Sequence, residues 1–279
     1  MRWIFPVLLI LVSAECGARQ KETAKALGFK TATFEKKIPL AELKTRFGEV
    51  SVTVDDYYLR RPMRYQAIPL SALLRAWASE ASGYDELIFR CADGYLAHVS
   101  RADFEAGKLN AFYLAFGQSL GAESPTADSF QVKIPQGKAE ISPEPFYAVS
   151  TDKAGFSTLS WPYELMQIEF VNFGQMFPKL MFAGLEKNPQ LKKGFDLFRG
   201  QCLKCHSLNL QGGDIGPELN IPRNITEYRD EAYLRAFIRD ASGYRAKSKM
   251  PPFASLSTDE MNAIISYLKQ MAAHKVGQP

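Results

Sequence analysis

The sequence QCLKCHSLN at residues 201–209 constrains this chain more than any other feature. It places Cys202, Cys205 and His206 within five adjacent positions, although the 279 residues include only four cysteines and three histidines. Two thiols separated by two residues can each form a thioether with a vinyl group of one haem, and the histidine that follows can then bind the iron. The spacing therefore favours a covalent haem attachment site.

Three other sites use closely spaced cysteines. A disulfide between Cys202 and Cys205 would not require the adjacent histidine, and a thioredoxin-type redox pair would follow a strand, whereas a helical pattern precedes Cys202. A zinc site would need further Cys or His ligands, and only His274 remains in this half of the chain. Met250, in KSKMPPF, offers a thioether to the other face of the iron, although a methionine beside two prolines is by itself more often a packing residue.

Residues 188–274 resemble a class I cytochrome c. The resemblance rests on five segments, GFDLFRGQCLKCH, GGDIGPEL, EAYLRAFI, KMPPF and LSTDEMNAIISYL. It implies an all-α domain with one covalent haem c attached at Cys202 and Cys205, and with His206 and Met250 as the axial iron ligands. Such a domain transfers single electrons, because iron with both axial positions filled leaves no open site for a substrate.

The resemblance also implies contacts that support this site. The backbone carbonyl at Pro217 would accept a hydrogen bond from the second imidazole nitrogen of His206, which orients the ring and raises its basicity. Gly194 and Phe198 would meet Tyr267 where the first and last helices of the domain cross, because a glycine allows two helices to approach closely.

Basic residues are concentrated in the last third of the chain. Residues 188–279 carry 13 Lys and Arg against 9 Asp and Glu, whereas the two signs balance before residue 188. Arg245, Lys247 and Lys249 precede Met250, so we expect them to surround the exposed haem edge and to steer an acidic redox partner. The alternative is that they are solvated loop residues. No basic cluster is interleaved with aromatic residues, which argues against nucleic-acid binding.

The first residues, MRWIFPVLLILVSAECGARQ, predict export. One arginine precedes an apolar run, and Val12 and Ala14 occupy positions that a signal peptidase prefers. The run is shorter than the ~20 residues that span a bilayer. We therefore expect a signal peptide at residues 1–14 and a periplasmic protein. A lipid anchor at Cys16 is the alternative and the only membrane association expected, but Glu15 is larger than the residue that usually precedes a lipidated cysteine.

After a polar lead-in at 15–30, residues 31–175 predict an α+β domain. EVSVTVDDYYL alternates like a half-buried strand, and IPLSALLRAWA has apolar residues at helical spacing after Pro69. Asp93-Gly94 divides DELIFRCADGYLAHV into a hairpin. Strand alternation is lost near Pro178, which predicts a linker at 176–188 before a cytochrome c domain at 189–279.

The first domain is similar in part to the molybdopterin-binding domain of the sulfite oxidase family. The similarity rests on Ile68-Pro69-Leu70, Asp93-Gly94-Tyr95 and the late strand in WPYELMQIEFVNF. That family has its metal-binding cysteine before the Pro-Leu helix, whereas residues 48–65 contain no cysteine. The similarity therefore implies a degenerate form of the fold. We expect Cys91 to be a buried packing residue and His98 to be structural.

These features predict two domains, an α+β domain with a degenerate sulfite-oxidase-like fold followed by an all-α class I cytochrome c domain. We expect a periplasmic mono-haem protein that carries single electrons between redox partners, with the first domain as a docking module. It is more an electron-transfer protein than an enzyme. The alternative is an enzyme whose first domain binds a molybdenum cofactor, oxidises a small substrate such as sulfite and passes electrons to its own haem.

Overall fold

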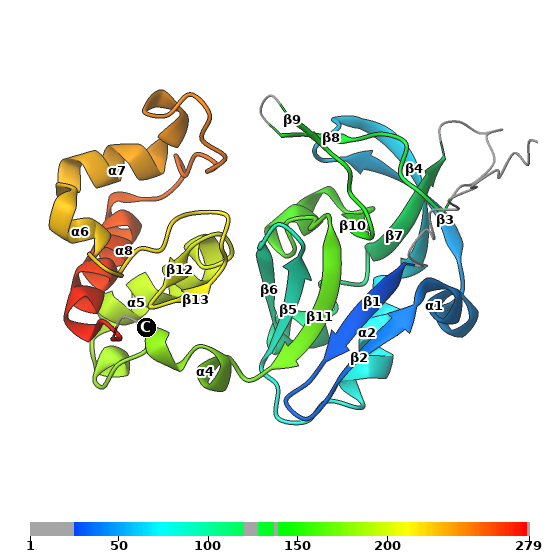
Figure 1. The fold of residues 1–279 in the computed structure, drawn as a ribbon, viewed down its shortest axis with the longest axis horizontal. Helices are drawn as coiled ribbons and strands as arrows, with labels where there is room; N and C mark the ends of the chain where they lie inside the picture. The colour runs from blue at the N-terminus through cyan, green and yellow to red at the C-terminus, as the bar shows by residue number, and fades with distance from the viewer. Residues whose placement is uncertain (1–24, 120–127, 137–138, 278–279) are drawn as a thin grey trace, which may run out of the picture.

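The computed structural model describes residues 25–119, 128–136 and 139–277. In these ranges the chain forms two parts that lie side by side, an N-terminal part at residues 25–171 and a C-terminal part at residues 189–277 (Figure 1). The predicted signal peptide at 1–14 and Cys16 lie outside the described residues. Among the helices that are described, none has the length and apolarity needed to cross a membrane.

Two sheets form the N-terminal part. The first has the order β2-β1-β11-β5-β6, in which β1 and β11 are parallel and the other neighbours antiparallel. The second has the antiparallel order β10-β7-β4-β3. The strands of the first sheet are β1 (Ala26–Lys30), β2 (Glu35–Pro39), β5 (Glu86–Cys91), β6 (Leu96–Ser100) and β11 (Leu165–Val171). Those of the second are β3 (Val50–Asp56), β4 (Arg61–Pro69), β7 (Phe112–Ser119) and β10 (Tyr147–Ser150).

Short elements complete this part. They are the helices α1 (Leu40–Phe47), α2 (Leu70–Ala78) and α3 (Arg101–Glu105), a hairpin of β8 (Ile134–Gln136) and β9 (Ala139–Ile141), and a 3₁₀ turn (Lys153–Ser157). The predicted helix after Pro69 is confirmed as α2, which buries four apolar side chains on one face. One of them, Trp77, stacks on Phe29 of β1 with 4.5 Å between ring centroids. β1 lies within residues 15–30, the stretch that was expected to be a polar lead-in. It is instead a core strand, in which Leu27 and Phe29 are fully buried.

The first sheet is buried on both faces where β5 runs through it. Leu87 and Phe89 of β5 point into the core of the N-terminal part. Ile88, which lies between them, belongs instead to the core of the C-terminal part. Since alternate residues of a strand point to opposite faces, the sheet itself forms the boundary between the two cores. The predicted hairpin at Asp93-Gly94 is confirmed as the turn between β5 and β6.

A chain of short turns leads to the C-terminal part. It consists of α4 (Phe173–Met176) and two 3₁₀ turns (Pro178–Leu180 and Leu185–Lys187). Phe173, Phe177 and Leu180 from these turns are buried in the C-terminal core. The C-terminal part then contains α5 (Pro189–Leu197), a π-helical turn (Phe198–Cys202), β12 (Ser207–Leu208), β13 (Gln211–Gly212), α6 (Ile225–Tyr228), α7 (Glu231–Arg239), a 3₁₀ turn (Ala241–Gly243), α8 (Thr258–Met271) and a final 3₁₀ turn (Ala272–His274).

The expected fold class, in which an all-α domain follows the α+β domain, is wrong. The structure as a whole is α+β with many strands, and its C-terminal part contains the antiparallel pair β12–β13 beside few and mostly short helices. The hairpin forms because Asn209 and Leu210 take positive φ angles of 56° and 63°, which close a tight turn. Long stretches around it, at 213–224 and 244–257, contain no helix longer than a turn.

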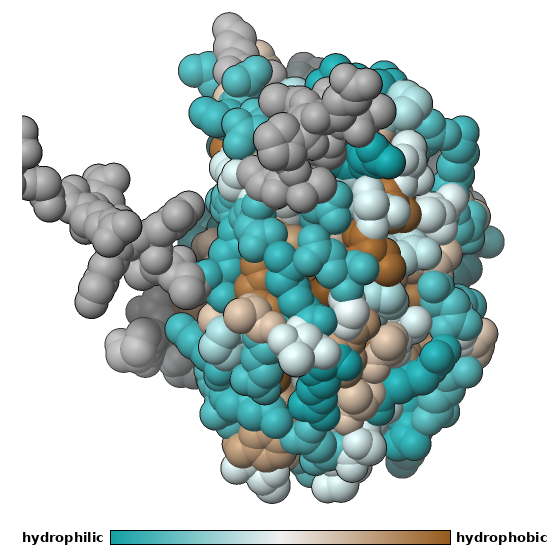
Figure 2. All heavy atoms as spheres, turned by 90° about the vertical axis from the view of Figure 1, so that its right-hand side faces the viewer, coloured by the Kyte–Doolittle hydropathy of each residue, from teal (hydrophilic) through white to brown (hydrophobic). Residues whose placement is uncertain are grey.

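The opposite face of the N-terminal part is exposed to solvent. Figure 2 shows this face as mostly hydrophilic side chains with apolar ones scattered among them. Single apolar side chains on a surface are ordinary in soluble proteins.

Candidate functional site

One large cavity lies between the two parts of the molecule, with a volume of about 1420 Å³. Cys202, Cys205, His206 and Met250 all line it. The structure thus brings the four predicted thioether and iron ligands to one place, although Met250 is distant from the others in sequence. The cavity also exceeds the roughly 300–1,000 Å³ of an ordinary small-molecule site.

The crossing of α5 and α8 positions the two cysteines. Asn188 caps α5 by accepting hydrogen bonds from the amides of Gln190 and Leu191, both at 3.1 Å. A Cβ atom at Gly194 would lie 2.0 Å from the carbonyl oxygen of Ala263 in α8, so only glycine fits there. The predicted contact with Tyr267 is confirmed, since the rings of Phe198 and Tyr267 lie 5.5 Å apart. Cys202 ends the π-helical turn that continues from this crossing.

His206 is held by the loop that follows the hairpin. Its Nδ1 donates a hydrogen bond of 2.8 Å to the carbonyl oxygen of Pro217. A proton on Nδ1 leaves Nε2 with a free lone pair, which is the form that binds a metal ion. Burial lowers the pKa of His206, which also favours the neutral ring. Gly216 lies against the imidazole so closely that a Cβ there would be 2.4 Å from its Cε1 atom.

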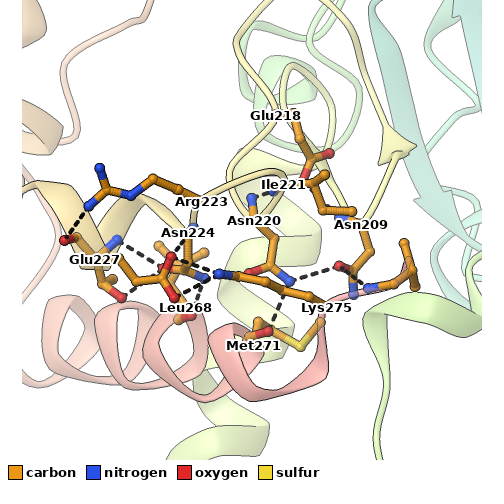
Figure 3. A network of polar contacts seen from close by, with 12 residues as sticks. Asn209, Glu218, Asn220, Ile221, Arg223, Asn224, Glu227, Leu268, Met271 and Lys275 are labelled. Atoms are coloured by element: carbon orange, nitrogen blue, oxygen red, sulfur yellow. Dashed lines mark hydrogen bonds and ion pairs between the residues drawn. The ribbon is translucent and has the colours of Figure 1, made fainter. Parts of the chain in front are cut away.

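Three buried asparagines fix this loop to the end of α8. Asn209, Asn220 and Asn224 have no exposed area and lie in a row along the helix (Figure 3). Asn220 donates 2.7 and 2.9 Å hydrogen bonds to the Asn209 side-chain oxygen and the Met271 carbonyl. Asn224 donates bonds of 2.7 and 2.8 Å to the Asn220 side-chain oxygen and the Leu268 carbonyl. The row satisfies carbonyls that the end of a helix leaves without partners.

A carboxylate completes the support of the hairpin. Glu218 accepts hydrogen bonds from the backbone amides of Asn209, Leu210 and Asn220 at 2.8 to 2.9 Å. Sequence reasoning missed Glu218 and the asparagine row. The only signal was three asparagines in a stretch rich in turn residues, and their partners in α8 are far away in sequence.

The two cysteines do not match the alternative sites considered for this spacing. Both thiols are unpaired. Burial raises the pKa of Cys202 to about 12 and that of Cys205 to about 11, whereas a thioredoxin-type nucleophile requires a lowered pKa. Within the described ranges, His, Cys, Asp and Glu residues form no group of three that could hold a metal ion such as zinc.

The donor set fits a haem. Two thiols, an imidazole with a free Nε2 and a thioether line a cavity whose other walls are largely apolar, including Phe198, Leu219 and Ile264. Met250 is half-buried in a turn in which its amide donates a 3.2 Å hydrogen bond to the Ser248 hydroxyl. Arg245, Lys247 and Lys249 are exposed on the rim of the same cavity.

The N-terminal part supplies the opposite wall. Its lining residues come from the β3–β4 turn, the β5–β6 turn and the segment before β11, and include Tyr57, Tyr58, Asp93, Tyr95, Ser160 and Tyr163. Sequence reasoning did not connect any of these with the cysteines, because the contact joins segments that lie about 40 to 150 residues apart and leaves no local pattern.

Neither Cys91 nor His98 lines the cavity. Cys91 is 4% exposed in the core of the N-terminal part, which confirms it as a packing residue. The His98 side chain is 5% exposed, with Nδ1 lying 3.3 Å from Glu86 Oε1. Burial lowers the pKa of His98 to about 3, so it is neutral. Gly94 has a φ of 88°, and Asp93 accepts a 3.0 Å hydrogen bond from the Tyr95 amide, as the predicted turn requires.

Comparison with known families agrees with this geometry. Residues 189–268 match the family of the cytochrome c oxidase, cbb3-type, subunit III. No curated protein gives a significant match. The C-terminal part is therefore a cytochrome c domain, which implies that it binds haem c and takes part in electron transport. Nothing supports the expected likeness of the N-terminal part to the sulfite oxidase family, since the match lies outside it.

Proposed function

We propose that the protein is an exported mono-haem electron carrier. In this proposal Cys202 and Cys205 attach the haem, and His206 and Met250 bind its iron. The observation that carries it is the convergence of these four side chains on one cavity, with His206 Nδ1 already bonded to the Pro217 carbonyl. For the predicted limits at 31–175 and 189–279, with a linker at 176–188, we further propose that the first domain also includes β1, because Leu27 and Phe29 are buried in its core.

The side chains of this site have distinct tasks. Haem, when bound, supplies a one-electron iron couple whose His/Met ligation favours the ferrous state. The Pro217 carbonyl holds the His206 ring in one orientation, and the loop carrying Pro217 is fixed by the asparagine row. Phe198, Leu219 and Ile264 exclude water from the cavity. Rigid ligands of this kind suit electron transfer, because little has to rearrange when the charge changes.

The redox partner is proposed from charge. Arg245, Lys247 and Lys249 are exposed in the segment that leads to Met250 and lie on the cavity rim. Clustered positive charge beside a redox centre attracts a negatively charged partner and speeds its association at low salt. We therefore propose a partner protein with an acidic docking face.

The proposed location follows from the sequence alone. Residues 1–14 have the pattern of a signal peptide, which favours the periplasm. A membrane association is proposed only for the case in which Cys16 carries a lipid. The proposed role of the N-terminal part is to take part in docking beside the haem cavity, whose wall it shares.

Haem attachment tests the proposal directly. Protein matured in a periplasm should retain its haem through acid–acetone extraction, because thioether bonds survive acid. The double variant Cys202→Ala, Cys205→Ala should lose the haem. Cys91→Ala is the matched control, because this cysteine is buried in the other core and should not affect attachment. A wild-type protein that releases its haem into acetone would contradict the proposal.

A further inference from the structure

The wall that the N-terminal part contributes to the cavity contacts residues 202–206, the proposed haem-attachment segment. The amide of Leu96, the first residue of β6, donates a 3.0 Å hydrogen bond to the carbonyl oxygen of Lys204. Lys204 lies between the two cysteines. The Asp214 amide donates a 3.3 Å bond to the Gly94 carbonyl in the β5–β6 turn. The turn therefore lies directly on the backbone that carries Cys205.

Side chains extend this contact along the edge of the cavity. The Lys204 amino group lies 3.5 Å from the Ser160 hydroxyl of the N-terminal part. Tyr95 and Tyr163 line the cavity beside Cys205. The Tyr163 hydroxyl accepts a 2.8 Å hydrogen bond from the side-chain amide of Gln136, which holds this ring in place at the wall. The wall is thus made of large, positioned aromatic side chains.

The contact between the two parts has the character of a core. Ile88 and Leu96 of the N-terminal part are at most 1% exposed and belong to the C-terminal core. Glu86, with a side chain that is 3% exposed, forms an ion pair with Arg199, whose guanidinium lies 3.9 Å from the Phe173 ring centroid. A buried carboxylate that loses its partner is strongly destabilising, so an interface of this kind does not open and close freely.

We propose that the N-terminal part is a permanent wall of the haem cavity, which keeps water from the haem edge at Cys205 and so raises the reduction potential. This inference rests on the function proposed above. Oxidised haem iron carries one more positive charge than the reduced form, and a dry, low-dielectric edge disfavours the more charged state. The covered edge also leaves the rim around Arg245 and Lys249 as the approach for a partner.

Two glycines provide a matched test in the full-length holoprotein. Gly94 has a φ of 88°, and a Cβ there would meet the Asp214 side chain at 3.3 Å. Gly83 has a φ of 68°, and its Cβ would meet nothing within 4 Å. Gly94→Val and Gly83→Val therefore introduce similar backbone strain, but only the first crowds Asp214 of the cytochrome c domain across the contact between the two parts.

The expected results distinguish an N-terminal part that shields the haem edge from water from one that only lies beside it. Gly94→Val should lower the reduction potential and make reduction by dithionite several-fold faster than in wild type, because solvent reaches the edge. Gly83→Val should match wild type in both. Tyr163→Ala removes a side chain of the wall without backbone strain and should act in the same direction, with Tyr113→Ala, outside the cavity lining, as its control. If Gly94→Val fails to fold, the comparison of Tyr163→Ala with Tyr113→Ala tests the inference instead.

Equal potentials and equal reduction rates in wild type, Tyr163→Ala and whichever glycine variants fold would overturn the inference while leaving the proposed carrier intact. A wild-type protein without covalent haem would instead overturn the proposed function, and this inference with it.

Discussion

Arg199 in the π-helical turn and Glu86 on β5 form an ion pair that joins the two parts of the molecule. The Glu86 side chain is 3% exposed and that of Arg199 28%, so the carboxylate is the more deeply buried partner. Arg199 lies three residues before Cys202 in the same π-helical turn, which connects the ion pair to that cysteine.

Removing the arginine should therefore be costly. Arg199→Ala leaves the Glu86 carboxylate buried without its partner, and we expect a loss of about 2–3 kcal/mol in the free energy of unfolding. Urea unfolding of the holoprotein measures it. Lys192→Ala is the control, because its i,i+4 pair with Asp196 is more exposed and should be worth less than about 0.5 kcal/mol. Equal losses in the two variants would contradict the buried role of Glu86.

The middle asparagine of the buried row should matter for stability and for His206. Asn220→Ala removes the side-chain donor to the Met271 carbonyl and leaves the Asn209 side-chain oxygen with only the 3.4 Å bond from the Val276 amide, which should cost about 2–3 kcal/mol. The loop carrying Pro217 should loosen as well, and nuclear magnetic resonance of the His206 ring protons would detect it.

Asn262→Ala is the matched control for this loss. Asn262 lies on α8, and its side chain makes no hydrogen bond to the residues that the structure describes. A loss in Asn220→Ala no larger than in Asn262→Ala would show that the row does not support the loop.

Local patterns predicted what depends on local chemistry. The spacing of Cys202, Cys205 and His206 follows from the size of one haem, and the helix after Pro69 follows from apolar periodicity, so both could be predicted from short segments. The C-terminal part was harder. Helical spacing in α5, α7 and α8 says nothing of the residues between them, and the positive φ angles at Asn209 and Leu210 produce a hairpin in a segment without strand alternation.

Contacts between distant segments could not be predicted in this way. The pairing of Leu96 with Lys204, and of Glu86 with Arg199, joins residues more than a hundred positions apart. Each residue alone has an ordinary role on a strand or helix surface. These residues come into contact only because β5 and β6 pack against the turn before Cys202. No periodicity in the sequence predicts that packing.

Met250 should determine the sixth ligand position of the iron. Met250→Ala should leave the haem attached but abolish the weak absorbance of the ferric iron–thioether bond near the red end of the spectrum. The reduction potential should fall by on the order of 100 mV, because axial ligands set much of the haem range. Met166→Ala, on the exposed side of β11, is the control. An unchanged spectrum in Met250→Ala would assign this position to another residue.

The basic rim should act through its charge. Lys249→Glu should slow oxidation of the reduced protein by ferricyanide, an anion, and weaken the dependence of that rate on salt. Lys187→Glu makes the same change in net charge on an exposed residue outside the cavity lining, and it should have a smaller effect. Stopped-flow rates at low and high ionic strength test this. Identical rates for both variants would mean that net charge, and not the rim, attracts the anion.

His98 should make the protein sensitive to acid. Its ring nitrogens have no hydrogen-bond partner among the described residues. The charged groups that act on it are those of Glu86, 3.3 Å from Nδ1, and of Arg90, Glu169 and Lys204. Burial lowers the pKa of His98 from 6.5 to about 3. Between these values the unfolded chain binds a proton on this ring and the folded protein does not. The free energy of unfolding therefore falls as the pH falls, by up to about 1.4 kcal/mol per pH unit.

Replacing the ring isolates this contribution from that of the carboxylates. In His98→Leu the free energy of unfolding should depend less steeply on pH between about 6 and 4 than in wild type. Phe177→Leu disturbs the same packing, since its ring lies 5.9 Å from that of His98, but it removes no titratable group and should keep the wild-type slope. Urea unfolding at a series of pH values measures both slopes. Parallel curves for wild type and His98→Leu would mean that this imidazole gains its proton in the folded protein as readily as in the unfolded chain.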